Sequence, residues 1–126
     1  MPSSAERKPN NMPSDCVFCK IAAGEVDGRI IYQDELAIAF WDIHPVAPVH
    51  ILIVPKKHIR SVNEMSVGDE MLIGHLFSVA KQIAKEQGVA ESGYRLSINT
   101  GSDAGQSVQH IHVHLMAGKA LPIHLG

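Results

Sequence analysis

Cysteine and aromatic residues are scarce in this chain of 126 residues. It contains two cysteines, and phenylalanine, tyrosine and tryptophan together make up 5% of it. Two cysteines do not make the disulfide framework that stabilises small secreted domains, so the cytoplasm is the expected location. The fold is therefore expected to depend on a hydrophobic core, and 45% of the residues are hydrophobic.

Long apolar runs and a strong net charge are also lacking in the sequence. No run approaches the roughly 20 apolar residues of a transmembrane helix, and the N-terminus lacks the apolar stretch of a signal peptide. A formal net charge of −2 provides no broad positive surface for nucleic acid. We therefore expect neither a membrane nor a nucleic acid as a partner.

The hydrophobic pattern predicts one α+β domain over residues 15–126, preceded by a disordered tail over 1–14 that is rich in proline, asparagine and serine. A short helix is expected over 17–22. A long helix is expected over about 66–87, because Ser66 and Asp69 resemble a capping box. Five strands, mostly antiparallel, are expected over 29–32, 36–43, 50–54, 94–99 and 109–116.

The segment 109–116 reads QHIHVHLM, so three histidines alternate with aliphatic residues. A period of two predicts a strand with His110, His112 and His114 on one face and the aliphatic residues facing the core. On a regular strand the outer two histidines would lie roughly 13 Å apart at Cα, too far to share one metal ion. Separate roles are therefore expected; the alternative is a solvent-facing row without a function.

The residues near this row suggest phosphate chemistry. The strands over 94–99 and 109–116 are joined too closely for a crossover helix, so they are expected to pair antiparallel and to bring Asn99 and Ser107 toward His112. The loop 101–107 can form a nest of N–H groups for an anion, or it can be an ordinary turn. Imidazole is a nucleophile at neutral pH. The residues thus favour phosphoryl or nucleotidyl transfer through a phosphohistidine.

The segment 110–116 also matches the His-φ-His-φ-His-φ-φ signature of the histidine triad (HIT) superfamily, where φ is a hydrophobic residue. The resemblance covers about residues 15–117 and is closest to the Hint branch of nucleoside phosphoramidases. Further matching segments are 18–21, 39–43, 48–50, 54–58 and 105–108. The resemblance implies a dimeric HIT-like fold, with the long helix and the strand over 94–99 at the interface between the two copies.

The resemblance also implies a reaction and the residues that perform it. His112 would attack the α-phosphorus of a purine nucleoside phosphoramidate, and water would then release the nucleoside monophosphate. His114 and Asn99 would contact the phosphate, Ser107 the phosphate or the leaving amine, and Asp42 the ribose hydroxyls. The other expected site residues line the base pocket, form the phosphate loop or lie behind the triad: Phe18, Phe40, Ile43, Gly105, Gln106, Val108 and His50.

Cys16 and Cys19 form a Cys-x-x-Cys pair, which alone fits a redox pair, two core thiols or half of a zinc site. Zinc would need two further ligands. Resemblance to the HIT proteins that bind zinc implies that His58 and His110 complete a structural site. The alternative is the same fold without a metal.

Other functions are compatible with the same residues. A related enzyme class would hydrolyse dinucleoside polyphosphates, and a metal-dependent histidine enzyme would lose activity to chelators. A nucleotide-binding or protein-interaction module would act without turnover, although the intact set of Asn99, Ser107, His112 and His114 argues for catalysis. The C-terminal segment 119–126 lacks the tryptophan common in Hint proteins, which leaves the leaving-group preference open.

Overall fold

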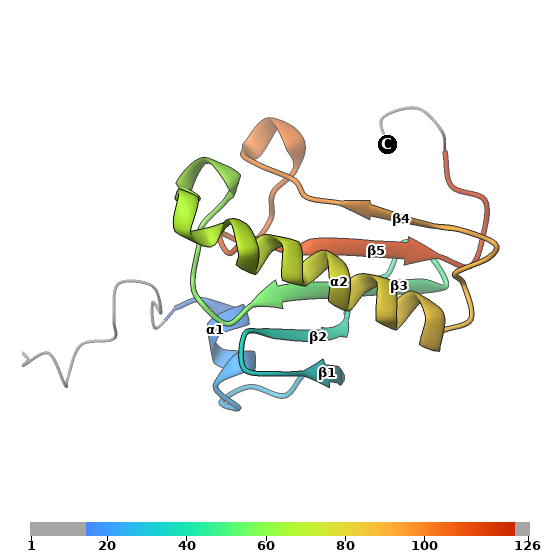
Figure 1. The fold of residues 1–126 in the computed structure, drawn as a ribbon, viewed down its shortest axis with the longest axis horizontal. Coiled ribbons are helices and arrows are strands. Elements are labelled where there is room, and N and C mark those ends of the chain that lie inside the picture. Colours follow the sequence, from blue (N-terminus) through green and yellow to red (C-terminus); the bar gives the residue numbers. More distant parts are fainter. Residues whose placement is uncertain (1–14, 123–126) are drawn as a thin grey trace, which may run out of the picture.

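The computed structural model describes residues 15–122, so the predicted tail over 1–14 and the last four residues lie outside the described part of the chain. Five strands form one antiparallel sheet in the order β1-β2-β3-β5-β4 (Figure 1). Their bounds are β1 Ile30–Gln33, β2 Ala37–Trp41, β3 Val49–Pro55, β4 Tyr94–Ser97 and β5 Val113–Ala117. The predicted α+β class and antiparallel sheet are confirmed.

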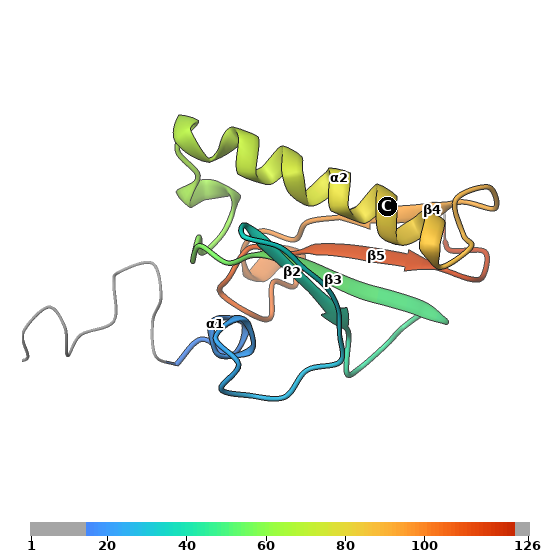
Figure 2. The same cartoon turned by 60° about the horizontal axis from the view of Figure 1, so that its bottom comes forward.

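Two helices cover opposite faces of this sheet. The long helix α2, Glu70–Glu86, packs on one face, and the short helix α1, Val17–Ala22, lies against the other (Figure 2). Buried side chains from α2, β3 and β5, among them Leu76, Ile53 and Leu115, form the larger core cluster. A smaller cluster joins α1 to the opposite face of β2 and β3. Among the described residues, no helix is long and apolar enough to cross a membrane.

The long helix begins later than the sequence pattern predicts. Residues Val67–Asp69 form a single 3-10 turn, and the α-helix follows from Glu70. The predicted capping box is present, because the Asp69 carboxylate accepts a hydrogen bond from the N–H of Ser66 at 2.9 Å. The same carboxylate also lies 2.6 Å from the Nζ atom of Lys57, which ties the start of the helix to the segment after β3.

The histidine segment differs more from its prediction. A strand over 109–116 was expected, but β5 begins at Val113, so His110 and His112 lie before the strand. The chain there leaves the ladder because the N–H of Ile111 donates to the carbonyl oxygen of Ile59, 2.7 Å away in a loop. The predicted division between faces still holds for these residues, since Val113 and Leu115 pack in the α2 core while His110 and His112 contact Phe18 of α1.

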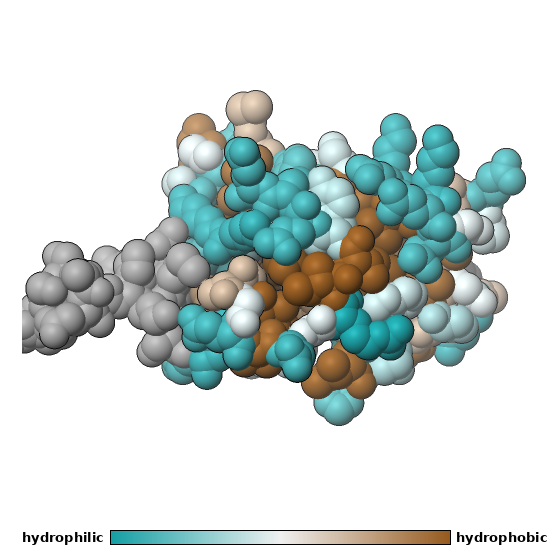
Figure 3. All heavy atoms as spheres, turned by 90° about the horizontal axis from the view of Figure 1, so that it is seen from below, coloured by the Kyte–Doolittle hydropathy of each residue, from teal (hydrophilic) through white to brown (hydrophobic). Residues whose placement is uncertain are grey.

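The outer surface of this arrangement is mixed in polarity. Figure 3 shows hydrophobic side chains between hydrophilic ones when the molecule is viewed from below. In the β1–β2 hairpin, Ile30 and Leu36 are 43% and 50% exposed.

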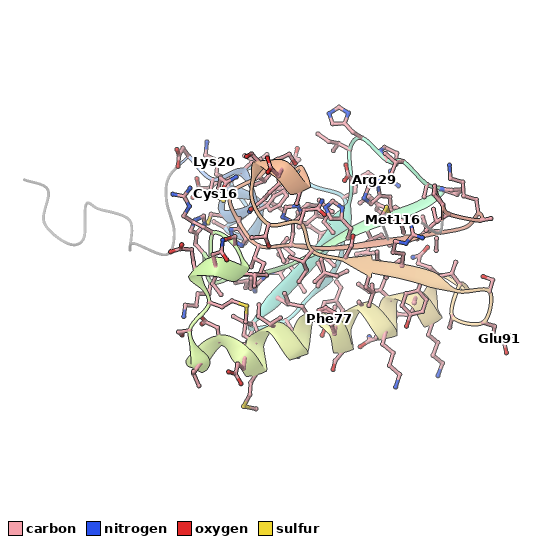
Figure 4. The ribbon with its side chains drawn as sticks, turned by 90° about the horizontal axis from the view of Figure 1, so that it is seen from above. Cys16, Lys20, Arg29, Phe77, Glu91 and Met116 are labelled. Carbon is pink, nitrogen blue, oxygen red and sulfur yellow. The ribbon has the colours of Figure 1, made fainter. Side chains whose placement is uncertain are left out.

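Figure 4 gives the view from above, with Cys16 on one side of the sheet and Phe77 on the α2 side. The chemistry-bearing residues therefore lie on the side opposite α2.

Candidate functional site

The three histidines of the row make different contacts, as the sequence pattern predicts. His110 is fully buried against the two cysteines of the α1 segment, and His112 is 3% exposed beside Phe18. His114 is the half-buried member, paired in register with Leu52 of β3 and Ser97 of β4. The rings of His112 and His114 are neighbours, with centroids 4.9 Å apart.

His112 is oriented by the main chain. Its Nδ1 atom lies 2.7 Å from the carbonyl oxygen of His110, and a carbonyl oxygen only accepts, so Nδ1 bears the hydrogen. The lone pair of the neutral ring is then on Nε2. The ring of Phe18 meets the imidazole edge to face at 5.1 Å and limits its rotation. The geometry thus leaves one nitrogen of His112 with an available lone pair.

His50 and Asp42 lie behind His114. His50 Nε2 is 3.0 Å from His114 Nδ1 and 3.3 Å from an oxygen of the Asp42 carboxylate. His50 reaches this place from β3, where it is 4% exposed. The other Asp42 oxygen accepts the N–H of His44 at 2.8 Å. Asp42, His50 and His114 thus bring together three side chains that could coordinate a metal ion.

Burial keeps these imidazoles neutral. It lowers the pKa of His114 to about 4, and the neighbouring His112 and His50 add to the effect. Burial also lowers the pKa of His112 and of His50, although the Asp42 carboxylate opposes this in both cases. Taking a charge out of water disfavours the imidazolium form. Near pH 7 the group therefore consists of neutral rings, which a nucleophilic mechanism requires.

The residues predicted for the base and the ribose differ in their burial. Phe18 and Phe40 are 6% and 4% exposed, and their rings meet at 5.3 Å. Ile43, in contrast, is 83% exposed just beyond β2. The Asp42 side chain is 17% exposed. Phe18 thus contacts both Phe40 and His112, and Asp42 reaches the histidine group through His50.

The glycine-containing loop over 101–107 folds around a 3-10 turn, and its members differ in their contacts. Gly101 and Gly105 have positive φ angles of 82° and 78° around a 3-10 turn. Gln106 is buried and holds the loop, because its amide donates to the carbonyl oxygen of Arg60 at 2.6 Å and accepts from the N–H of Gly101. Asn99 and Ser107 were expected to be brought toward His112, and among the described residues neither makes a hydrogen bond to it.

Cys16, Cys19, His58 and His110 form a second group, whose donor atoms lie within 4.8 Å of one another. The Nε2 atom of His110 lies 2.7 Å from the carbonyl oxygen of Pro55 and therefore bears the hydrogen. The Nδ1 lone pair then points at the sulfurs of Cys16 and Cys19, at 3.3 and 3.6 Å. This tautomer suits a metal ligand with a backbone partner on its other nitrogen. The group is able to hold a metal ion.

A cleft of about 940 Å³ lies next to this group. It is lined by residues of the α1 segment, the loop after β3 and the end of the glycine loop, including Cys16, Lys57, His58, Arg60, Ser107 and Val108. His112 and His114 are not among the lining residues. Among the residues predicted for the phosphate site, Gly105, Gln106 and Asn99 do not line the cleft either, whereas Ser107 and Val108 do.

Two main-chain groups in these sites were not predicted from the sequence. The carbonyl of Pro55 orients His110, and the N–H of Val46 donates to His50 Nδ1 at 3.1 Å. Main-chain groups have no signature in the sequence, since every residue but proline offers the same donor and acceptor.

Known proteins share both this fold and these motifs. A family model described as the HIT domain matches residues 23–121. The chain belongs to the HIT domain family. The purine nucleoside phosphoramidase of Escherichia coli (strain K12) is 46% identical to it over 110 residues, which are 87% of this chain and 92% of that protein.

Solved HIT structures superimpose closely on this chain. A HIT family hydrolase from Legionella pneumophila Philadelphia 1 has a TM-score of 0.86 and 43% identity, covering 89% of this chain and all of that one. A histidine triad protein from Clostridium difficile has a TM-score of 0.84 and 47% identity, covering 86% and 95% of the two chains. The resemblance to the HIT superfamily that the sequence suggested is confirmed.

Proposed function

We propose that this HIT protein is a hydrolase that cleaves purine nucleoside phosphoramidates to nucleoside monophosphates, through a nucleotidyl intermediate on His112. One observation supports the mechanism most directly. The buried His112 donates from Nδ1 to a main-chain carbonyl and so offers Nε2 as a nucleophile beside His114. The substrate class follows from the purine nucleoside phosphoramidase that is 46% identical to this chain.

The proposed reaction has two displacements at phosphorus. In the first, the Nε2 lone pair of His112 forms a bond to the α-phosphorus while the P–N bond breaks. The amine leaves with the electron pair of that bond and takes up a proton. In the second, the oxygen of water forms a bond to phosphorus and gives up a proton, while the bond from phosphorus to His112 Nε2 breaks and its electron pair returns to the ring. Splitting one difficult substitution in this way lowers the barrier to each step.

The other expected site residues would bind the nucleotide. Phe18, Phe40 and Ile43 would hold the base, and the Asp42 carboxylate would accept the two ribose hydroxyl hydrogens. His114 would donate to a phosphate oxygen, with His50 behind it. The rest of the phosphate site would be Asn99 and the loop residues Gly105, Gln106, Ser107 and Val108. Ser107 borders the cleft, and we propose that it contacts the phosphate or the leaving amine.

We further propose that the metal held by Cys16, Cys19, His58 and His110 is a structural zinc. With Zn–S of about 2.3 Å and Zn–N of about 2.1 Å, tetrahedral coordination separates sulfur and nitrogen donors by about 3.6 Å and two nitrogens by about 3.4 Å. The distances here are 3.3 to 3.6 Å between sulfur and nitrogen, and 3.1 Å between the Nδ1 atoms of His58 and His110. A donor set of four protein ligands is typical of structural zinc.

A homodimer is proposed as well. The strand β4 is an edge of the sheet, and Met71 on α2 is 89% exposed. An unpaired edge and an exposed apolar side chain are features that a second copy would cover. We also propose a cytoplasmic location, because two cysteines are too few for the disulfide framework of a small secreted domain.

The enzymatic proposal is tested by measuring release of AMP from adenosine 5′-phosphoramidate. Wild type is expected to turn over, and His112→Ala to lose about 10⁴-fold or more in kcat, as for the loss of other catalytic nucleophiles. His75→Gln is the matched control, since His75 lies on α2 and contacts Asp34. Full activity in His112→Ala, or faster cleavage of diadenosine triphosphate than of the phosphoramidate by wild type, would refute the proposal.

A further inference from the structure

The loop between β2 and β3 makes one contact with the histidine group. The main-chain N–H of Val46 donates a hydrogen bond to His50 Nδ1, 3.1 Å away. The side chain of Val46 is 62% exposed, so this residue contributes to the site through its backbone. A ring nitrogen that accepts a hydrogen bond bears no hydrogen. The hydrogen of neutral His50 must therefore be on Nε2.

The surroundings of Nε2 agree with this tautomer. His50 Nε2 faces His114 Nδ1 at 3.0 Å and the Asp42 carboxylate at 3.3 Å. An ionised carboxylate only accepts, so a hydrogen on Nε2 suits it as well. The two neighbours with fixed roles, the Val46 N–H at Nδ1 and the Asp42 carboxylate at Nε2, thus favour the same tautomer.

The arrangement also fixes His114. If His114 bore its hydrogen on Nδ1, two N–H groups would point at each other across 3.0 Å. His114 Nδ1 therefore accepts, and its hydrogen lies on Nε2, the nitrogen turned away from His50. The pKa of His114, lowered to about 4 by burial, keeps the ring neutral at pH 7. The hydrogen that His114 can offer to a ligand is then in one defined position.

We propose that Val46 is a positioning residue, whose main-chain N–H sets the tautomer of His50 and, through it, the N–H that His114 presents to the substrate phosphate. The role in catalysis rests on the function proposed above. Second partners that fix the tautomer of a functional histidine commonly affect its performance. The same tautomer makes the Asp42, His50 and His114 group a poor metal site, because the Nε2 atom of His50 that faces the other two residues is protonated.

The tautomers are measured without substrate by long-range proton–nitrogen NMR of protein labelled with ¹⁵N in its histidine rings. The expected result is a pyridine-type Nδ1 and a pyrrole-type Nε2 for both His50 and His114 at pH 7. A pyrrole-type Nδ1 on either residue would overturn the proposal. Since no substrate is present, this outcome does not depend on whether the phosphoramidase function is correct.

The origin of the effect is tested with two substitutions at position 46. Val46→Pro removes the N–H, and Val46→Ala keeps it while truncating the same exposed side chain. In Val46→Pro we expect the nitrogen signals of His50 and His114 to shift toward a mixture of tautomers. We also expect kcat for AMP release to fall severalfold, with KM close to that of Val46→Ala. Identical spectra and kcat in the two variants would contradict the proposal.

If Val46→Pro does not fold, two variants of His50 test whether this residue sets the tautomer of His114. His50→Gln retains an amide oxygen for the Val46 N–H and an amide N–H for His114 Nδ1, whereas His50→Ala retains neither. His114 in His50→Gln is expected to keep the wild-type tautomer, and His50→Ala to show the mixture. The same His114 signals in both variants would overturn the proposal. If the spectra agree but wild type releases no AMP, the proposed function fails and the assignment of tautomers stands.

Discussion

His110 donates a hydrogen bond from Nε2 to the carbonyl oxygen of Pro55, at 2.7 Å. Pro55 ends β3, so the rigid end of a central strand orients a side chain that lies just before β5. Because the other ring nitrogen faces two buried sulfurs, this one contact prepares His110 as a metal ligand.

A first prediction concerns the metal. Protein purified without chelator should contain one zinc per chain, and removing it should lower the melting temperature by about 10 °C or more, because a metal that binds only the folded state stabilises it. Cys19→Ser should lose the zinc, whereas Asp42→Asn should retain one equivalent. A zinc content near zero in wild type, or an equal loss in Asp42→Asn, would count against the assignment of this site.

A second prediction concerns the ribose. Asp42→Ala should raise KM about tenfold to a hundredfold, since a hydrogen bond to a charged group contributes about 1.5–3 kcal/mol. A substrate without the 2′ and 3′ hydroxyls should show a similar increase with wild type and little further increase with Asp42→Ala. Fully additive effects of the two changes would mean that Asp42 does not contact the ribose.

A third prediction follows from the pKa of His114, which burial lowers from 6.5 to about 4. Between these values an unfolded chain binds a proton that the folded chain does not. The free energy of unfolding should therefore fall as the pH falls from 6.5 toward 4, and this contribution should then level off. His114→Gln should lose that part of the pH dependence in denaturation curves. The same pH dependence in both proteins would contradict the assignment.

The decrease of kcat/KM at low pH provides a second measure of the His114 pKa, because this ratio reports ionisations in the free enzyme. Activity should be nearly constant at roughly pH 6 to 8 and should decline only well below 6.5. A decline of kcat/KM centred at pH 6.5, the ordinary pKa of histidine, would mean that no essential histidine has a lowered pKa.

A fourth prediction concerns the turn that follows β5. Gly118 has a φ of 94°, and a Cβ there would lie 2.9 Å from the Cβ of Pro48. Gly88 has a φ of 73° with nothing within 4 Å of its Cβ position. Gly88→Ala should cost about 1–2 kcal/mol for its left-handed backbone, and Gly118→Ala should cost more, because Pro48 must also shift. Chemical denaturation of the two variants compares them; an equal loss would exclude the steric contribution.

Much of the fold follows from local patterns in the sequence. The alternation over 113–117 and the apolar runs of β2 and β3 predict strands because their side chains are sorted by face or buried on both. The long helix follows from its apolar stripe. The predicted start of this strand at residue 109 was wrong because Ile111 bonds to Ile59, a partner 52 residues earlier. A local pattern has no information about such a contact.

The candidate site was less accessible to local reasoning. The alternating histidines predicted separate roles, and the structure places His110, His112 and His114 against different partners. Which role each residue has depended on the resemblance to the HIT superfamily. The tautomers depended on the main-chain groups of Pro55 and Val46, whose positions exist only in the folded chain.

The central claim, that His112 becomes covalently attached to the nucleotide, is tested most directly by intact-protein mass spectrometry after rapid quenching of a reaction with adenosine 5′-phosphoramidate. The account predicts an added mass equal to one adenylyl group on wild type, mapped to His112 by peptide analysis and missing from His112→Ala. An adduct of the same mass that persists in His112→Ala, or AMP release by that variant at the wild-type rate, would contradict it.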